Sequence, residues 1–147
     1  MRSKRCHGVR SARALAAWGL LSALWAIPIL SSAAPLLDEQ TEALIVDAVE
    51  AAFELDLYNS RCRQDRSGRR TENLNKALAS GFRMTVIDAQ DDLFPEGYYR
   101  DVQERMTRDF LARLRAMGGC AGAKEAKLRN ELRARYEQAM EQLEQFP

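Results

Sequence analysis

Apolar residues recur after residue 38 at spacings of three and four, the period of an α-helix with one buried face. The first such stretch covers 38–62, and its inward positions are Leu44, Ala48, Ala51, Leu55, Tyr58 and Cys62. Further apolar residues widen this surface well beyond a single stripe, namely Ile45, Val49, Ala52 and Phe53, and the excess apolar face includes Val46, Phe53 and Leu57. The pattern predicts a long central helix, and either several neighbouring helices or a partner would cover its excess apolar face.

Two further helices are predicted before residue 118. Ser67 and Gly68 interrupt the first pattern, and the hydroxyl of Thr71 is suited to cap a second helix. The inward face of this second helix is expected to be Leu74, Leu78, Phe82 and Thr85. Residues 91–97 have the composition of a turn, and Pro95 can begin a third helix because the first helical position needs no amide hydrogen. The core face of that helix is expected to be Tyr99, Val102, Met106, Phe110, Leu114 and Met117.

A fourth helix completes an all-α fold. Gly118 and Gly119 end the third helix, since glycine adopts the left-handed conformation at low cost. The apolar positions of the fourth helix are Leu128, Leu132, Tyr136, Ala139 and Leu143. The chain after residue 33 has no convincing alternating run typical of a strand. Short connections favour antiparallel neighbours, so an up-down-up-down four-helix bundle is the simplest architecture.

The cysteines test this topology. Cys62 and Cys120 fall at the first and third connections, which lie at the same end of such a bundle. A disulfide between them closes a loop of about 60 residues and, in the chain-entropy estimate, stabilises the fold by roughly 4 kcal/mol. We therefore predict one disulfide, with two free thiols as the alternative.

The amino-terminal third has the pattern of a secretory signal peptide. Five basic residues and no acid precede residue 14, and residues 14–30 carry no charge. Small residues follow, which predicts cleavage after Ala33 and leaves residues 34–147 as a single domain. An uncleaved membrane anchor is the competing hypothesis, because seventeen apolar residues are at the short limit for a bilayer span. Cleavage predicts a periplasmic or secreted protein without stable membrane insertion.

Cleavage also changes the charge and the available chemistry. Five of the 22 basic residues leave with residues 1–33, so 17 remain against 21 acids, a net charge of −4. This mild acidity disfavours a general nucleic-acid-binding protein. The only histidine, His7, also leaves, which excludes Ser-His or Cys-His catalysis and histidine-ligated metals in the remaining chain. No cofactor is expected.

The densest charged feature is an arginine-rich segment, residues 61–70, which contains a single acid, Asp65. Its basic residues are Arg61, Arg63, Arg66, Arg69 and Arg70. In the predicted bundle they lie at the disulfide end, together with Lys124 and Lys127. Arginines bind carboxylates and phosphates in bidentate fashion, so this segment is a candidate site for an acidic partner or another anion. Solvated arginines, or arginines paired with acids of the first helix, are the alternative.

The opposite end of the predicted bundle is acidic. Its middle turn offers Asp88, Asp91, Asp92 and Glu96 as candidate ligands for a hard cation, although their spacing does not match an EF-hand. The same acids could instead cap a helix and complement its dipole. Phe94, Tyr98 and Tyr99 lie beside them and would either stack on a ligand or close the end of the bundle.

These observations favour a small, exported, non-enzymatic helical protein that binds another protein in an accessory, chaperone-like or inhibitory role. A carboxylate-dependent hydrolase and a divalent-cation binder, both at the acidic end, are the alternatives. The sequence does not identify the partner.

Overall fold

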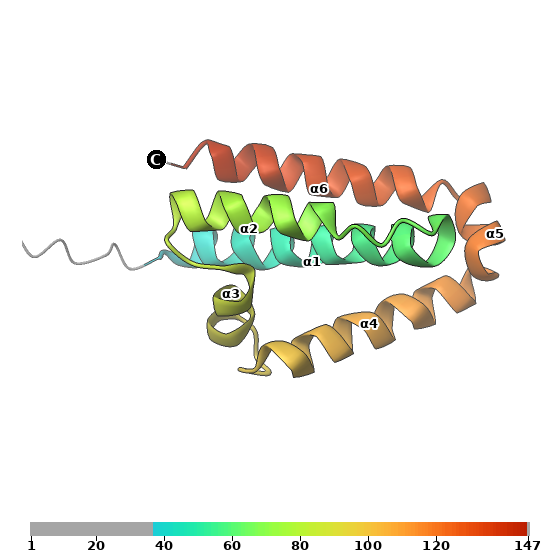
Figure 1. Cartoon of the computed structure of the whole chain (residues 1–147), viewed down its shortest axis with the longest axis horizontal. Helices are drawn as coiled ribbons and strands as arrows, with labels where there is room; N and C mark the ends of the chain where they lie inside the picture. Colours follow the sequence, from blue (N-terminus) through green and yellow to red (C-terminus); the bar gives the residue numbers. More distant parts are fainter. Residues whose placement is uncertain (1–36, 147) are drawn as a thin grey trace, which may run out of the picture. The chain divides into compact units, whose positions relative to one another are not determined.

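The structure is a computed structural model that describes residues 37–146. This part of the chain contains six helices and no strand (Figure 1). They are α1 (Glu39–Arg63), α2 (Arg69–Gly81), α3 (Val86–Leu93), α4 (Tyr99–Ala116), α5 (Gly119–Glu125) and α6 (Leu128–Glu144). The all-α prediction is confirmed. The predicted signal peptide, residues 1–33, lies outside the described residues.

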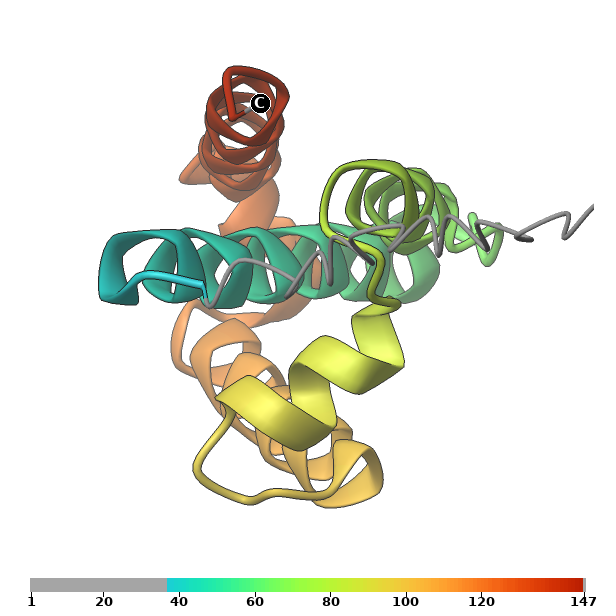
Figure 2. The same cartoon turned by 90° about the vertical axis from the view of Figure 1, so that its left-hand side faces the viewer.

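α1 is the central element of residues 37–146. The side chain of Asp38 accepts a hydrogen bond from the Thr41 amide at 2.7 Å and caps its start. Gln64, in the left-handed conformation with φ 59°, ends it. α1 packs on α2, α3, α4 and α6, and α6 and α4 lie on opposite sides of it (Figures 1 and 2). Contact with four neighbours explains most of the broad apolar face that the sequence predicts.

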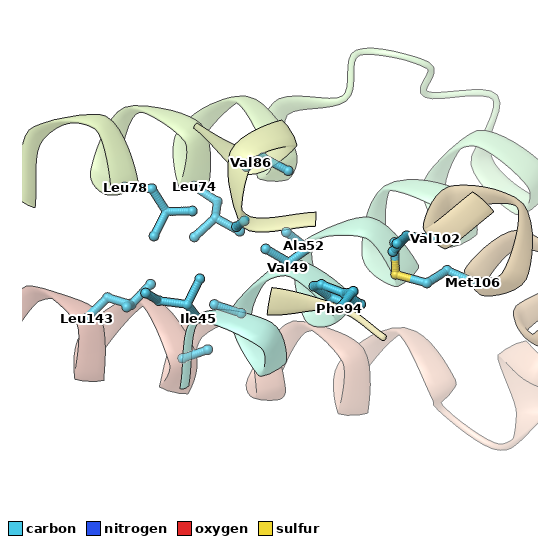
Figure 3. Packing of buried hydrophobic residues seen from close by; sticks show 13 residues of the cluster. Ile45, Val49, Ala52, Leu74, Leu78, Val86, Phe94, Val102, Met106 and Leu143 are labelled. Carbon is cyan, nitrogen blue, oxygen red and sulfur yellow. The ribbon is translucent and has the colours of Figure 1, made fainter. Parts of the chain in front are cut away.

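The core consists of two clusters arranged along α1. The larger contains buried residues from α1, α2, α3, α4 and α6. In Figure 3, Leu74 and Leu78 of α2 and Leu143 of α6 approach Ile45 and Val49 of α1. The smaller cluster lies at the disulfide end and comprises Leu55, Tyr58, Phe110, Leu114, Ala123, Leu128 and Leu132. Each fully buried large aliphatic side chain contributes about 1.5–3 kcal/mol through removal of apolar surface from water.

The predicted disulfide is present. Cys62, in the last turn of α1, is bonded to Cys120, in the first turn of α5, with 5.4 Å between their Cα atoms. The prediction that both cysteines occupy the same end of the domain is therefore confirmed. The bond joins residues 58 positions apart and fixes the end of α1 to the connection between α4 and α6.

The predicted helix count is wrong, because the segment around residue 90 is itself helical. Thr85 does not face the core but caps α3, in a reciprocal capping box with Asp88. Pro95 does not begin a helix: Phe94 ends α3, and the next helix begins at Tyr99. The apolar periodicity of the sequence did not reveal the capping box at Thr85 or the end of α3 at Phe94.

The Gly118–Gly119 pair does end α4, and both glycines have positive φ, 85° and 75°. The chain then forms the short helix α5, which the sequence did not predict. Gly122 makes this turn possible, because an added Cβ would lie only 1.7 Å from the Met117 carbonyl oxygen. The sequence did not predict α5 because two of its seven residues, Gly119 and Gly122, are glycines, which disfavour a helix.

The four long helices run in alternating directions in Figure 1, as expected, but they do not form a closed ring of four. α2 packs on α1, α3 and α6, whereas α4 packs on α1, α3 and α5. α3 is inserted between α2 and α4, which places α1 at the centre instead of at a corner. None of the helices in residues 37–146 is both long enough and apolar enough to cross a membrane.

Candidate functional site

The arginine-rich segment connects α1 to α2 and follows the disulfide end of α1. Arg61 and Arg63 lie in the last turn of α1, Arg66 in the loop, and Arg69 and Arg70 in the first turn of α2. Four of the five side chains are exposed, and Arg70 is half-buried. The structure thus keeps these arginines near one end of α1 but gives them different surroundings.

Asp56 of α1 determines where this segment begins its helix. Its carboxylate accepts hydrogen bonds from the Arg70 and Thr71 amides, at 3.3 and 2.9 Å, and from the Thr71 hydroxyl at 3.0 Å. The predicted role of Thr71 as the cap is therefore wrong: its hydroxyl donates to Asp56, while Gly68 occupies the N-cap position without a side chain. The capping interaction comes from another helix, so it also fixes α2 to α1.

Arg70 pairs with two carboxylates at the junction of α1 and α2. Its guanidinium lies 4.0 Å from the Asp56 carboxylate and 3.7 Å from that of Asp65. The hydrogen bonds that Asp65 accepts from Ser67 hold the pKa of Asp65 below its usual value. Arg70 thus has a structural role, which matches the alternative that some of these arginines pair with acids.

An apolar groove lies beside the arginine-rich segment, between α1, α2 and α3. It has a volume of about 690 Å³, and Phe53 and Leu57 of α1 and Val86 and Ile87 of α3 line it. Ile87 is 48% exposed, the highest value among the exposed large hydrophobic side chains of residues 37–146. The part of the α1 apolar face that the neighbouring helices leave partly exposed therefore includes Phe53 and Leu57, which are half-buried.

A second hollow extends this groove along α4. Its volume is about 520 Å³, and it shares Phe53 and Gln103 with the first. Leu111 of α4 supplies a further apolar wall. Together, the two hollows form what we call the α1 groove, an apolar channel that runs between α2 and α3 on one side and α4 on the other. Insertion of α3, which keeps α2 and α4 apart, creates it.

The charges along the α1 groove are mixed, because Asp56, Glu72 and Glu104 line it as well as three arginines. Arg66 lines the part beside α2, and Arg108 and Arg115 line the part beside α4. Arg108 lies 3.7 Å from Asp109. Arg66 and Arg115 form no ion pair with any of residues 37–146. Two arginines at the groove are thus available to a carboxylate from outside the domain.

The sequence indicated part of this groove. Phe53 and Leu57 line the groove, whereas Val46 does not; all three are partly buried against the core clusters. Ile87 and Leu111 were missed. Ile87 could only have been found by recognising that the segment after Thr85 is a separate helix with its own apolar face.

The acids of α1 face two arginine-bearing helices. Arg135 of α6 contacts the carboxylates of Asp47, Glu50 and Glu54 at 2.6, 3.2 and 3.4 Å. Arg105 and Arg113 of α4 contact the same face, at 3.7 Å from Glu50 and from Glu54 respectively. This ion-pair network joins α4 and α6 to α1. It pairs each of these carboxylates with an arginine.

Protonation in this network depends on burial. Desolvation raises the pKa of Glu54 above its usual value, and the nearby charges of Arg135 and Arg113 only partly offset this effect. Desolvation alone would lower the pKa of Arg135, but its hydrogen bond to Asp47 and the surrounding carboxylates raise it.

The acidic candidates of the middle segment have other partners. Asp88 caps α3, and its hydrogen bonds with Thr85 hold the pKa of Asp88 below the usual value. Asp91 accepts a hydrogen bond from the Tyr99 amide at the start of α4, and Glu96 pairs with Arg105. Asp92 is exposed. Within residues 37–146, no group of three or more histidine, cysteine or acidic side chains is placed to hold a metal ion.

The aromatic residues beside these acids divide between core and surface. Phe94 is only 5% exposed and belongs to the larger core cluster. Tyr98 is exposed and contacts the Tyr99 ring edge-on, with 5.1 Å between ring centroids. Phe94 thus closes the core, and the three rings do not form one ligand-facing platform.

Comparison of this chain with protein-family models, with curated proteins and with solved structures found no match. Functional inference therefore depends on the residues of the molecule itself. The features that remain available for binding are the α1 groove and the arginines that form no ion pair within residues 37–146, such as Arg66 and Arg115.

Proposed function

We propose that this chain is exported, that its signal peptide is cleaved after Ala33, and that residues 34–147 act in the periplasm or outside the cell as a non-enzymatic protein-binding domain. The partner would lie in the α1 groove. A role as an accessory, chaperone-like or inhibitory component is consistent with the small size and the disulfide. The observation that carries the proposal is the groove in which the partly exposed Phe53 and Leu57 of α1 lie beside the exposed Ile87 of α3.

The groove has the chemistry of a site for an apolar peptide segment. Phe53, Leu57, Ile87 and Leu111 would be covered by the partner, and burial of such surface drives association. Arginine is enriched at protein interfaces because its planar fork pairs with carboxylates. Arg66 and Arg115 would therefore select a segment that carries acidic residues next to its apolar ones.

Site-specific photocrosslinking in the native host tests the proposal. A photoreactive phenylalanine derivative replaces Ile87, whose exposed side chain lines the groove, and the crosslinked products are identified by mass spectrometry. The same residue placed at Gln138, an exposed position of α6 that lines none of the described cavities, is the control. We expect one recurrent protein adduct at position 87 and none at position 138.

Charge reversal gives a second, matched comparison. Arg66→Glu should reduce the yield of the adduct, whereas Arg61→Glu, an exposed arginine of the same segment that does not line the groove, should leave it unchanged. No adduct at position 87, the same adducts at positions 87 and 138, or equal losses in the two arginine variants would contradict binding in the α1 groove.

A further inference from the structure

We infer a second binding site, separate from the α1 groove, for a small phosphate monoester between α2 and α6. Arg69 and Arg70 of α2 face Arg129 and Arg133 of α6 across a cavity of about 360 Å³. The remaining lining residues are Leu55 of α1, Asn73 of α2, and Tyr136 and Glu137 of α6. We call this the arginine cavity.

Four arginines and a single carboxylate, that of Glu137, line the arginine cavity. Arg70 lies near Asp56 and Asp65, and Arg133 donates to Glu137 at 2.7 Å. Arg69 and Arg129 form no ion pair with any residue of the described chain. Like charges that converge from two helices repel each other, so an anion between them would stabilise this arrangement. The charge of Arg69 also acts on Asp65 and Glu72, so the preference for a dianion rests on the four guanidinium groups that line one cavity.

Arg129 adds a donor that lacks an acceptor. Its Nε atom is buried and has no hydrogen-bond partner within the described residues. A buried donor left unsatisfied costs about 1–3 kcal/mol, and a small shift of the Arg129 side chain toward the cavity would let a bound oxyanion accept this hydrogen bond. Guanidinium groups donate in pairs to phosphate oxygens, which is the geometry that best fits several converging arginines.

The size of the cavity favours an esterified phosphate over the bare ion. Its volume falls at the lower end of the range for small-molecule pockets, about 300–1,000 Å³. Leu55 and the ring of Tyr136 offer apolar surface to the organic group of an ester, while the four arginines surround the charged group. Burial raises the pKa of Tyr136 above its usual value, and its neutral hydroxyl can act as a hydrogen-bond donor.

The site is independent of the proposed partner groove. The arginine cavity and the α1 groove have no lining residue in common. Both use α1 and α2, but of these two sites α6 lines only the arginine cavity, and α3 and α4 line only the α1 groove. Loss of ligand binding in the arginine cavity would therefore leave the crosslinking result at position 87 unchanged, and the reverse also holds.

Isothermal titration of the disulfide-bonded domain with phenyl phosphate tests the inference, at 150 mM NaCl and pH 7.5. Phenyl sulfate, which has the same shape and one charge fewer, is the control ligand. We expect saturable binding of one phenyl phosphate per chain and weaker binding of phenyl sulfate. Binding should also weaken below pH 6, because the second pKa of a phosphate monoester is about 6.

Two variants locate the binding. Arg129→Gln and Arg69→Gln should each weaken phenyl phosphate binding by about tenfold or more, the loss expected for one charged hydrogen-bonding group. Arg61→Gln, which lies in the same segment but does not line the cavity, should bind as the wild type does. Arg69 is exposed, so its variant remains decisive if replacement of the half-buried Arg129 impairs folding.

The inference is overturned by an absence of saturable phenyl phosphate binding. It is equally overturned if phenyl sulfate binds as tightly as phenyl phosphate, or if Arg61→Gln weakens binding as much as Arg69→Gln does. Inorganic phosphate provides a further comparison: it should bind more weakly than phenyl phosphate, and equal affinity would contradict the role of the apolar wall.

Discussion

Replacement of Asp56 by alanine should destabilise the domain more than a typical single substitution on a helix surface. The Asp56 side chain is only 14% exposed, and its carboxylate accepts three hydrogen bonds from the start of α2. Loss of a capping side chain alone costs about 0.5–2 kcal/mol. Because the carboxylate is charged and the bonds cross between two helices, we expect a loss of about 3 kcal/mol in the free energy of unfolding.

Asp56→Asn should lose about half as much, since the remaining amide oxygen can still accept from one of the α2 amides. Urea unfolding followed by far-ultraviolet circular dichroism measures both values. Asp92→Ala, at an exposed acid of α3, is the matched control and should stay within about 0.5 kcal/mol of wild type. Hydrogen exchange at the Arg70 and Thr71 amides should accelerate in Asp56→Ala. A loss in Asp56→Ala no larger than in Asp92→Ala would refute the capping role.

Three other substitutions test the fold. Joint replacement of Cys62 and Cys120 by alanine should lower the unfolding free energy, measured in urea, by about 4 kcal/mol. A loss below about 1 kcal/mol would contradict the idea that the disulfide stabilises the fold by restricting the unfolded chain. Glu54→Gln should be more stable than wild type at pH 7. Burial raises the pKa of Glu54, so the native state favours the neutral acid. The stability that the protonated Glu54 contributes below pH 4.5 is therefore lost as the pH rises, whereas glutamine stays neutral. This advantage should vanish by about pH 4, and a constant difference between the unfolding curves would refute it. Gln90→Met should add about 1 kcal/mol to thermal or urea stability, because the buried Nε2 of Gln90 has no partner in the described chain, while water can replace the hydrogen bond that its Oε1 accepts from the half-buried Gln103. A loss of stability would show that the bond from Gln103 outweighs the unpaired donor.

Helical periodicity was enough to predict the long elements and the end of the domain at which the cysteines meet. The predicted range 38–62 differs from α1 by one residue at each end. α3 and α5 were missed for a physical reason: eight and seven residues are too few for periodicity to separate them from their neighbours, and capping interactions define their limits.

Tertiary contacts were the part that the sequence could not supply. Asp56 caps a helix that begins 13 residues later in the chain, and Arg135 reaches Asp47 over a separation of 88 residues. Phe53 and Leu57 stood out as excess apolar residues, but only the insertion of α3 shows which side of α1 stays uncovered. The arginine cavity likewise depends on α6, whose Arg129 and Arg133 are distant in sequence from the arginine-rich segment.

Methyl nuclear magnetic resonance of the disulfide-bonded domain tests the central claim, that a partner occupies the α1 groove, most directly. The domain is titrated with the protein recovered by crosslinking at Ile87. The account predicts that the methyl signals of Leu57, Ile87 and Leu111 shift together and saturate, while those of the buried Leu78 and Leu143 remain in place. Shifts confined to the methyl groups of α6, or no shift at Leu57 and Leu111, would contradict it.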